Sequence, residues 1–134
     1  MKKLICSIIF ALFPIHASAD QMNCENATTT IQINTCIGQE IEAANYLLTQ
    51  YVAKAKARYA DQAEVIASIA HAQQNWLAYR QSHCDSVYDI WSDGSIRGAM
   101  FGECMLQLTK QRTHQIWKDY LTFMDSTPPL LPEP

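Results

Sequence analysis

The sequence is poor in residues that break helices and poor in charge. It has four glycines and five prolines in 134 residues, and four of the prolines lie within residues 126–134. Ten basic residues stand against 13 acidic ones, for a net charge of −3. This charge leaves no basic patch large enough to bind nucleic acid, so nucleic-acid partners are excluded. Because 49% of the residues are hydrophobic and 10% are aromatic, wholesale disorder is excluded as well.

The sequence also lacks the motifs that carry catalysis in many enzymes. It has no G-x-S-x-G, no glycine-rich phosphate loop, no H-E-x-x-H and no calcium loop. Acid pairs occur at Glu40/Glu42 and Asp85/Asp89, but on helices such pairs usually form a solvated face. Two histidines twelve residues apart are more than three helical turns distant, which does not suit a shared metal ion. We therefore expect no enzyme activity, no cofactor and no metal.

The longest apolar run stands at the N-terminus and has the features of a secretion signal. Met1-Lys2-Lys3 precedes an apolar run over residues 4–13, and Ala17-Ser18-Ala19 supplies the small residues of a cleavage site. A membrane span needs roughly 20 apolar residues, whereas Pro14 interrupts this run early. No cysteine follows the cleavage site directly, so a lipid anchor is not expected. We expect cleavage after residue 19 and a periplasmic or secreted product without a membrane anchor.

Removal of the signal changes the charge and the cysteine count. Without Lys2 and Lys3, the ten basic residues become eight against 13 acidic ones, so the net charge becomes −5. The fifth cysteine, at position 6, leaves with the signal. The four that remain are Cys24, Cys36, Cys84 and Cys104. An even number in an exported chain indicates two disulfides, and the long gaps between the cysteines do not suit a zinc site.

Four cysteines allow three pairings. Proximity in sequence favours Cys24–Cys36, which would pin the N-terminal lead onto the first helix, and Cys84–Cys104, which would clamp the loop between the second and third helices. A pairing of Cys36 with Cys84 is the rival, because these two would lie at nearly the same level of an antiparallel hairpin.

Between the signal and the tail, apolar residues recur at helical spacing, and no segment alternates long enough to be a strand. The first helix lies within residues 28–59. Its apolar face comprises Ile37, Ile41, Ala44, Leu48, Tyr51 and Ala55. Asp61 is expected to cap the second helix, with Glu64 three residues on, and that helix runs to about Ile90. A turn at residues 92–95 leads into the third helix.

Short connections between long helices predict antiparallel neighbours. We therefore expect an all-α fold, a small up-down-up three-helix bundle stapled by two disulfides. The expected domain limits are a signal peptide at residues 1–19, a helical domain at 20–125 and a proline-rich flexible tail at 126–134.

One helical stripe combines aromatic residues with arginine, in the pattern Trp76-x-x-Tyr79-Arg80-x-x-x-Cys84. Arg112 repeats the situation on the third helix. A guanidinium on an apolar stripe must stack on a ring or pair with an acid. Two interpretations remain open: the arginines tie helices together through acids such as Glu40 or Glu103, or the stripe is a partly exposed interface patch.

Several of these motifs together resemble the LprI-like lysozyme inhibitor domain, over about Cys24 to Trp117. The matching segments are Cys24-x11-Cys36, Ala72-Gln73-x-x-Trp76-x-x-Tyr79-Arg80-x-x-x-Cys84, Gly94-Ser95 and Cys104-x3-Leu108-Thr109-x-x-Arg112. The resemblance implies a small exported helical protein that inhibits lysozyme. Family members usually carry an acid and an amide in the first helix where this chain has Asn45 and Thr49.

The connection after the second helix is the first candidate for contact with a lysozyme. It holds turn residues, a tryptophan and an arginine, and its glycines let a partner's backbone approach closely. We predict that Ser95 and Arg97 contact catalytic carboxylates while Trp91 packs at the rim. The alternative is a plain connection whose Gly-Ser pair caps the third helix. The full candidate interface is Trp76, Tyr79, Arg80, Trp91, Asp93, Gly94, Ser95, Arg97, Thr109 and Arg112.

The predicted function is an exported binding protein that inhibits a lysozyme or another peptidoglycan hydrolase by protein contact. Many lysozymes are strongly basic, so a net charge of −5 would speed their encounter with this chain. Two alternatives stay open: a periplasmic immunity protein against a wall-degrading toxin, and a non-inhibitory structural or envelope-stress protein.

Overall fold

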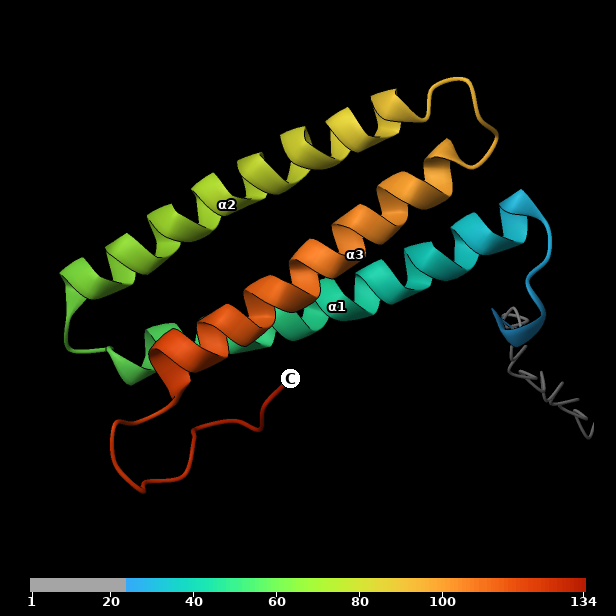
Figure 1. Ribbon diagram of the computed structural model, residues 1–134. Coiled ribbons are helices and arrows are strands. Elements are labelled where there is room, and N and C mark those ends of the chain that lie inside the picture. The colour runs from blue at the N-terminus through green and yellow to red at the C-terminus, as the bar shows by residue number, and fades with distance from the viewer. Residues whose placement is uncertain (1–23) are drawn as a thin grey trace, which may run out of the picture.

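The computed structural model describes residues 24–134, in which three long helices alternate in direction (Figure 1). No strand occurs in that part of the chain, so the predicted all-α, up-down-up bundle is confirmed. A short 3-10 turn precedes the helices and a π-helical turn follows them. The elements are η1 (Cys24–Asn26), α1 (Thr30–Arg58), α2 (Ala63–Ile90), α3 (Arg97–Ile116) and η2 (Trp117–Leu121). The predicted signal peptide lies outside the described residues.

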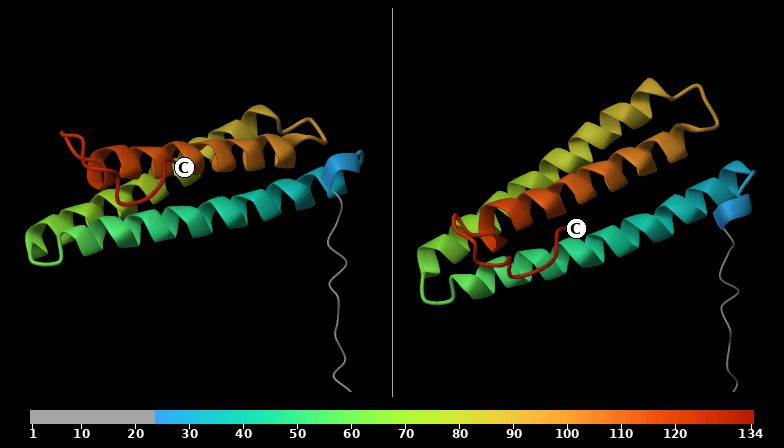
Figure 2. Two further views of the ribbon diagram at one scale, coloured as in Figure 1. Left: turned by 90° about the horizontal axis from the view of Figure 1, so that it is seen from below. Right: turned by 60° about the horizontal axis from the view of Figure 1, so that its bottom comes forward.

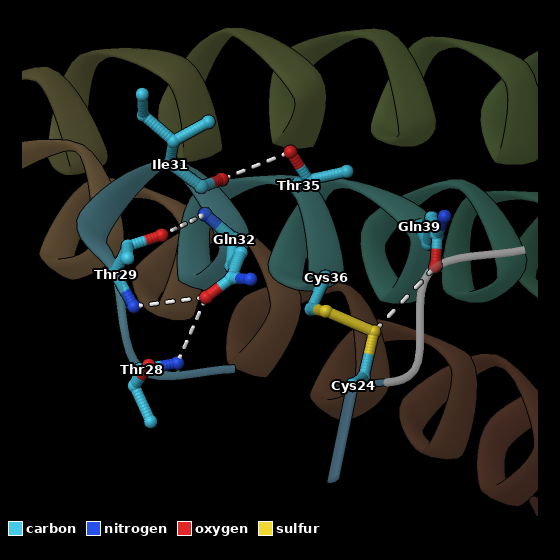
Figure 3. The surroundings of a disulfide bond; sticks show 8 residues. All are labelled: Cys24, Thr28, Thr29, Ile31, Gln32, Thr35, Cys36 and Gln39. Atoms are coloured by element: carbon cyan, nitrogen blue, oxygen red, sulfur yellow. Dashed lines mark hydrogen bonds between the residues drawn. A yellow bond between two sulfur atoms is a disulfide. The ribbon is translucent and has the colours of Figure 1, made fainter. Parts of the chain in front are cut away.

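The first two helices begin differently. α1 starts with a capping box: Gln32 N donates to Thr29 Oγ1 (3.2 Å) and Thr29 N donates to Gln32 Oε1 (3.1 Å), as Figure 3 shows. The predicted Asp61 cap of α2 is wrong, because the N-cap is Gln62 and its side chain makes no capping bond. The backbone bond from Gln62 N to Tyr59 O (2.8 Å) closes the turn and places Asp61 before the helix.

α3 is the central packing partner of the bundle. It lies along both other helices, whereas α1 and α2 contact each other little beyond the turn that joins them, and they diverge away from it (Figure 2). Close approach of α3 to α1 depends on Gly102, because a Cβ there would overlap the side chain of Ile37. The resulting gap between α1 and α2 is lined partly by polar side chains.

The main hydrophobic core sits toward the α1–α2 turn. Its fully buried members come from all three helices and from η2: Leu48, Tyr51, Val52, Ala55, Ile69, Ile116 and Leu121. Partly buried aromatic and aliphatic side chains, Trp76 and Trp117 among them, surround this cluster. The apolar face predicted for the first helix is therefore the face that packs.

The proline-rich tail folds back onto the bundle toward α1 (Figure 1). The Tyr51 hydroxyl donates to Pro132 O (2.7 Å), and Trp117 Nε1 donates to Leu131 O (3.0 Å). Leu130 and Leu131 pack against the core. The sequence predicts a flexible tail at residues 126–134, whereas the structure docks the end of that segment on the helices.

Both disulfides have the pairing that proximity in sequence favours. Cys24 is bonded to Cys36 and Cys84 to Cys104, each pair with Cα atoms 5.7 Å apart. The first bond holds η1 against α1, where Gln39 Oε1 lies 3.7 Å from Cys24 Sγ (Figure 3). The second joins α2 to α3 and fixes the two helices that flank residues 91–96.

Candidate functional site

Arg80 reaches from α2 into the middle of the bundle and touches both other helices. Its Nη1 donates to Asn45 Oδ1 on α1 (2.7 Å) and to Thr109 Oγ1 on α3 (2.6 Å). Its guanidinium lies 4.8 Å from the centre of the Trp76 ring, within cation–π range. The residue is only 9% exposed, and its burial lowers the pKa of the guanidinium. Arg80 is therefore an internal tie rather than a surface contact.

Arg112 is the counterpart of Arg80 on α3 and is equally buried, at 9% exposure. Its Nε donates to Gln73 Oε1 (3.1 Å) and its Nη1 donates to Gln115 Oε1 (2.8 Å). Burial lowers the pKa of Arg112, and the nearby Tyr120 and Asp119 oppose that shift. The Arg112 guanidinium lies 5.9 Å from the centre of the Trp76 ring, so this ring is within cation–π range of both arginines.

The interpretation that these arginines pair with Glu40 or Glu103 is wrong. Glu40 lies 3.8 Å from Lys110 Nζ, and Glu103 accepts a hydrogen bond from Gln107 (3.0 Å). Among residues 24–134, the acceptors that the two guanidiniums use are amide and hydroxyl oxygens. The arginines do tie helices together, but through neutral partners.

The predicted stripe is divided between the interior and the surface. Trp76 and Arg80 face inward, and Cys84 is fully buried. Tyr79 is exposed and stacks on His83, with ring centres 5.5 Å apart. Tyr79 and Arg80 therefore form no joint exposed patch.

The connection between α2 and α3 is a series of turns held at several points. Gly94 N donates to Trp91 O (2.9 Å), and Arg97 Nη1 donates to Ser92 O (3.3 Å). The Arg97 guanidinium also lies 5.0 Å from the Tyr88 ring centre. These contacts, together with the Cys84–Cys104 bond, give the connection a defined shape.

Ser95 does not cap α3, which corrects the alternative interpretation of this connection. The N-cap is Ile96, and its side chain makes no capping bond. Ser95 and Asp93 are exposed, and Trp91 is 39% exposed. The side chains that were predicted to contact a partner are thus accessible at this position.

Exposed isoleucines also occur at this end of the bundle. Ile90 is 77% exposed and Ile96 is 44% exposed. Ile31, at the start of α1, is 78% exposed and lies at this end because α1 begins where α2 ends (Figures 1 and 2). The sequence reasoning missed these isoleucines. Ile31 falls outside the apolar face of its helix, and this was the signal that could have found it.

Acidic residues follow the last turns of α2 toward this end. Asp85, Asp89 and Asp93 are all exposed, and the last turn of α2 holds no basic residue. An acid at a helix C-terminus opposes the helix dipole, which applies to Asp89, whereas Asp85 accepts a hydrogen bond from Gln81 one turn earlier (2.8 Å). We call the combined area the loop-end surface. It comprises Asp85, Asp89, Ile90, Trp91, Asp93, Ser95, Ile96 and Arg97.

Two features are absent from the described residues: a cluster of metal-binding side chains and a helix that could span a membrane. Within residues 24–134, no three metal-binding side chains of His, Cys, Asp or Glu come together. None of the helices in this part of the chain combines the length and the apolar character that a membrane span requires.

Comparison with known proteins places this geometry in a family. The chain is 25% identical over 114 residues to an uncharacterized protein of Rhizobium meliloti (strain 1021), covering 77% of this chain and 82% of that protein. No solved structure matches. The profile of the family described as "Lysozyme inhibitor LprI" matches residues 22–116, which include both disulfides and all three helices. The chain therefore belongs to the LprI lysozyme inhibitor family.

Proposed function

We propose that this protein is exported and inhibits a lysozyme or another peptidoglycan hydrolase, without catalysis of its own, by binding through the loop-end surface. Membership of an inhibitor family supports the activity. Two disulfides support a location outside the cytoplasm, because such bonds persist in oxidising compartments. The observation that carries the choice of surface is the exposure of Ile90, Trp91 and Ile96 along a connection whose flanking helices are joined by a disulfide.

The loop-end surface has the composition of a binding site rather than of an ordinary solvated surface. Aromatic and arginine side chains dominate the binding energy of many interfaces, and Trp91 and Arg97 lie in one connection here. Ile90 and Ile96 are exposed beside them. Clustered exposed apolar residues mark interaction sites more often than isolated ones do.

Arg97 is held ready for contact with an anionic group. Its hydrogen bond to Ser92 O and its place over the Tyr88 ring restrict the side chain before any partner binds. A restricted side chain loses less entropy on binding than a free one. Arg97 is exposed and so is Ser95, which allows both to reach the carboxylates that flank a lysozyme cleft.

The charge of the surface suits a basic target. The exposed aspartates at positions 85, 89 and 93 lie on the approach to Trp91, and the chain without its first 19 residues carries a net charge of −5. Opposite charges steer encounter and raise association rates, most strongly at low salt. The negative electrostatic potential of the loop-end surface would therefore attract a basic lysozyme.

The test is a titration of the protein, expressed from residue 20, into lysozymes of several structural types while the muramidase rate is followed. The proposal predicts saturable inhibition of at least one enzyme at micromolar concentration or below. It predicts weaker inhibition at high salt, because the aspartates are exposed. If no lysozyme is inhibited and no wall hydrolase is captured from envelope extracts, the proposal fails.

A further inference from the structure

A second candidate site lies in the gap between α1 and α2, away from the loop-end surface. A groove with a volume of about 420 Å³ opens there. Its lining combines three aliphatic side chains with four polar ones: Leu48, Val52, Leu77, Asn45, Thr49, Gln73 and Arg80. We call it the α1–α2 groove.

Arg80 brings an uncompensated positive charge to this groove. Its Nη1 is used by Asn45 and Thr109, but its Nε is buried without a hydrogen-bond partner, and its Nη2 has none among residues 24–134. No carboxylate of the described residues pairs with Arg80. Moving a guanidinium from water into a protein interior costs free energy, and neutral acceptors offset this cost only in part.

The amide side chains of the groove are also left as donors. Asn45 uses its Oδ1 to accept from Arg80, and Gln73 uses its Oε1 to accept from Arg112. The amide nitrogens of both residues then have no partner within residues 24–134. Together with Arg80 Nη2, the residues that line this groove therefore hold three nitrogen donors without a protein acceptor among residues 24–134.

Such a set of donors selects a negatively charged acceptor. Hydrogen bonds between a guanidinium and a carboxylate are stronger than those to neutral oxygens, and Arg80 can donate such a bond from Nη2, because Nη1 is occupied and Nε is buried. The leucine and valine side chains beside the donors would cover a small aliphatic group. A bare inorganic anion would leave them without a partner.

We propose that the α1–α2 groove binds a small aliphatic carboxylate, such as a short-chain acid or the C-terminal carboxylate of a short peptide. The carboxylate pairs with Arg80 and accepts from Asn45 and Gln73, and the aliphatic part packs on Leu77 and its neighbours. This site is separate from the loop-end surface, so the proposal does not depend on whether the protein inhibits a lysozyme.

The test uses thermal unfolding and calorimetry of the protein expressed from residue 20, with N-acetyl-alanyl-alanine as the probe. Its C-terminal amide is the uncharged control, and sodium chloride at matched ionic strength controls for salt. A small ligand with one charged contact should bind with a dissociation constant of about 1 mM or below. At about 20 mM probe, the unfolding midpoint should then rise by roughly 5 °C. Isobutyrate, tested in parallel, separates a preference for peptides from binding of any aliphatic acid.

The decisive variant is Asn45→Asp, which keeps the shape of the side chain and places an internal carboxylate next to Arg80 Nη1. It should raise the unfolding midpoint of the free protein and abolish the response to the probe. Asn75→Asp makes the same chemical change at an exposed position of α2 and should leave the response intact.

Saturable binding of the carboxylate that is lost with the amide and in Asn45→Asp supports the site. The proposal is overturned if the probe gives no response, if the amide or chloride acts equally, or if Asn45→Asp responds like the wild type. Asn45→Asp is expected to be more stable than the wild type. A missing response to the probe in this variant could therefore not be attributed to unfolding.

Discussion

Two buried arginines share a single tryptophan at the centre of the bundle. Each of these guanidiniums needs hydrogen-bond acceptors inside a helical core, and the acceptors that Arg80 and Arg112 use are neutral oxygens rather than carboxylates. Trp76 supplies a ring to both, and amides and a hydroxyl supply the oxygens. The hydrogen bonds fix the relative positions of three helices, so the polar interior specifies how they pack.

Thr109→Val replaces one buried hydroxyl of this polar interior with a methyl group and tests how much that hydroxyl stabilises the fold. Thr109 is fully buried, and its hydroxyl accepts from Arg80 while it donates to Met105 O (2.7 Å). Loss of this hydroxyl removes a hydrogen-bond acceptor from the buried Arg80 guanidinium. The free energy of unfolding, measured by urea denaturation, should therefore fall by about 1–3 kcal/mol. Valine keeps the β-branched shape, so packing changes little.

Thr35→Val is the matched control for this substitution. Thr35 makes the same type of bond to the carbonyl four residues earlier, Ile31 O (2.9 Å), but it is exposed and has no arginine partner. Its free energy of unfolding should change by less than about 0.5 kcal/mol. Equal losses in the two variants would show that the arginine contact contributes nothing.

The helices themselves follow closely from the sequence, whereas their caps and spacing do not. The end of α2 at Ile90 and the apolar face of α1 were both predicted from periodicity. The start of α2 was not, because a backbone turn at Tyr59 and Gln62 decides it rather than the acidic side chain of Asp61. The close contact of α1 with α3 depends on a glycine that no periodic pattern marks.

Gly102→Ala tests the packing of α3 on α1. The added methyl would overlap Ile37, so either the side chain must leave its rotamer or the helices must separate. We expect a loss of about 1–3 kcal/mol in the free energy of unfolding. Circular dichroism should show unchanged helix content, because alanine favours helices.

Gly38→Ala provides the control on the other helix. A Cβ at Gly38 meets no atom within 4 Å, so only the backbone effect remains. This variant should gain roughly 0.5–1 kcal/mol, because glycine costs that much in a helix interior. A gain in both variants would contradict the close approach at Gly102.

At the scale of the whole molecule, the tail completes the core that the three helices begin. Leu130 and Leu131 cover the cluster around Ile116, and the backbone oxygens of the tail accept from Tyr51 and Trp117. Composition alone could not predict this, because proline-rich segments are typical of mobile extensions. The isolated leucine pair between prolines is the residue-level feature that makes docking favourable.

A chain ending at Ser126 tests the role of the tail. It loses two partly buried leucines, the hydrogen bonds from Tyr51 and Trp117 to the tail, and the bond from Leu130 N to Leu121 O, so the free energy of unfolding should fall by about 2–3 kcal/mol. Glu133→Gln is the control, because it removes only the negative charge from the exposed contact with His114 and should change stability by less than about 0.5 kcal/mol. Unchanged stability in the truncated chain would mean that the docked tail adds nothing.

The candidate sites were predictable to unequal degrees. Trp91, Asp93, Ser95 and Arg97 stand together in the sequence, so their shared connection could be found from turn residues alone. That α1 begins at the end of the bundle where this connection lies is a tertiary fact, which the spacing of residues does not encode. The donors of the α1–α2 groove could not be predicted, because they depend on which atom of each side-chain amide is already hydrogen-bonded to an arginine. The spacing of residues in the sequence does not encode this.

The measurement that tests the central claim most directly compares the inhibition of a susceptible lysozyme by Trp91→Ala and by Tyr46→Ala. Both side chains are exposed aromatics, but Tyr46 lies in the middle of α1, away from the loop-end surface. If the loop-end surface binds the enzyme, Trp91→Ala should raise the concentration for half inhibition by about 30-fold. Tyr46→Ala should change it by less than about twofold. Equal effects, or a larger effect at Tyr46, would contradict inhibition through the loop-end surface.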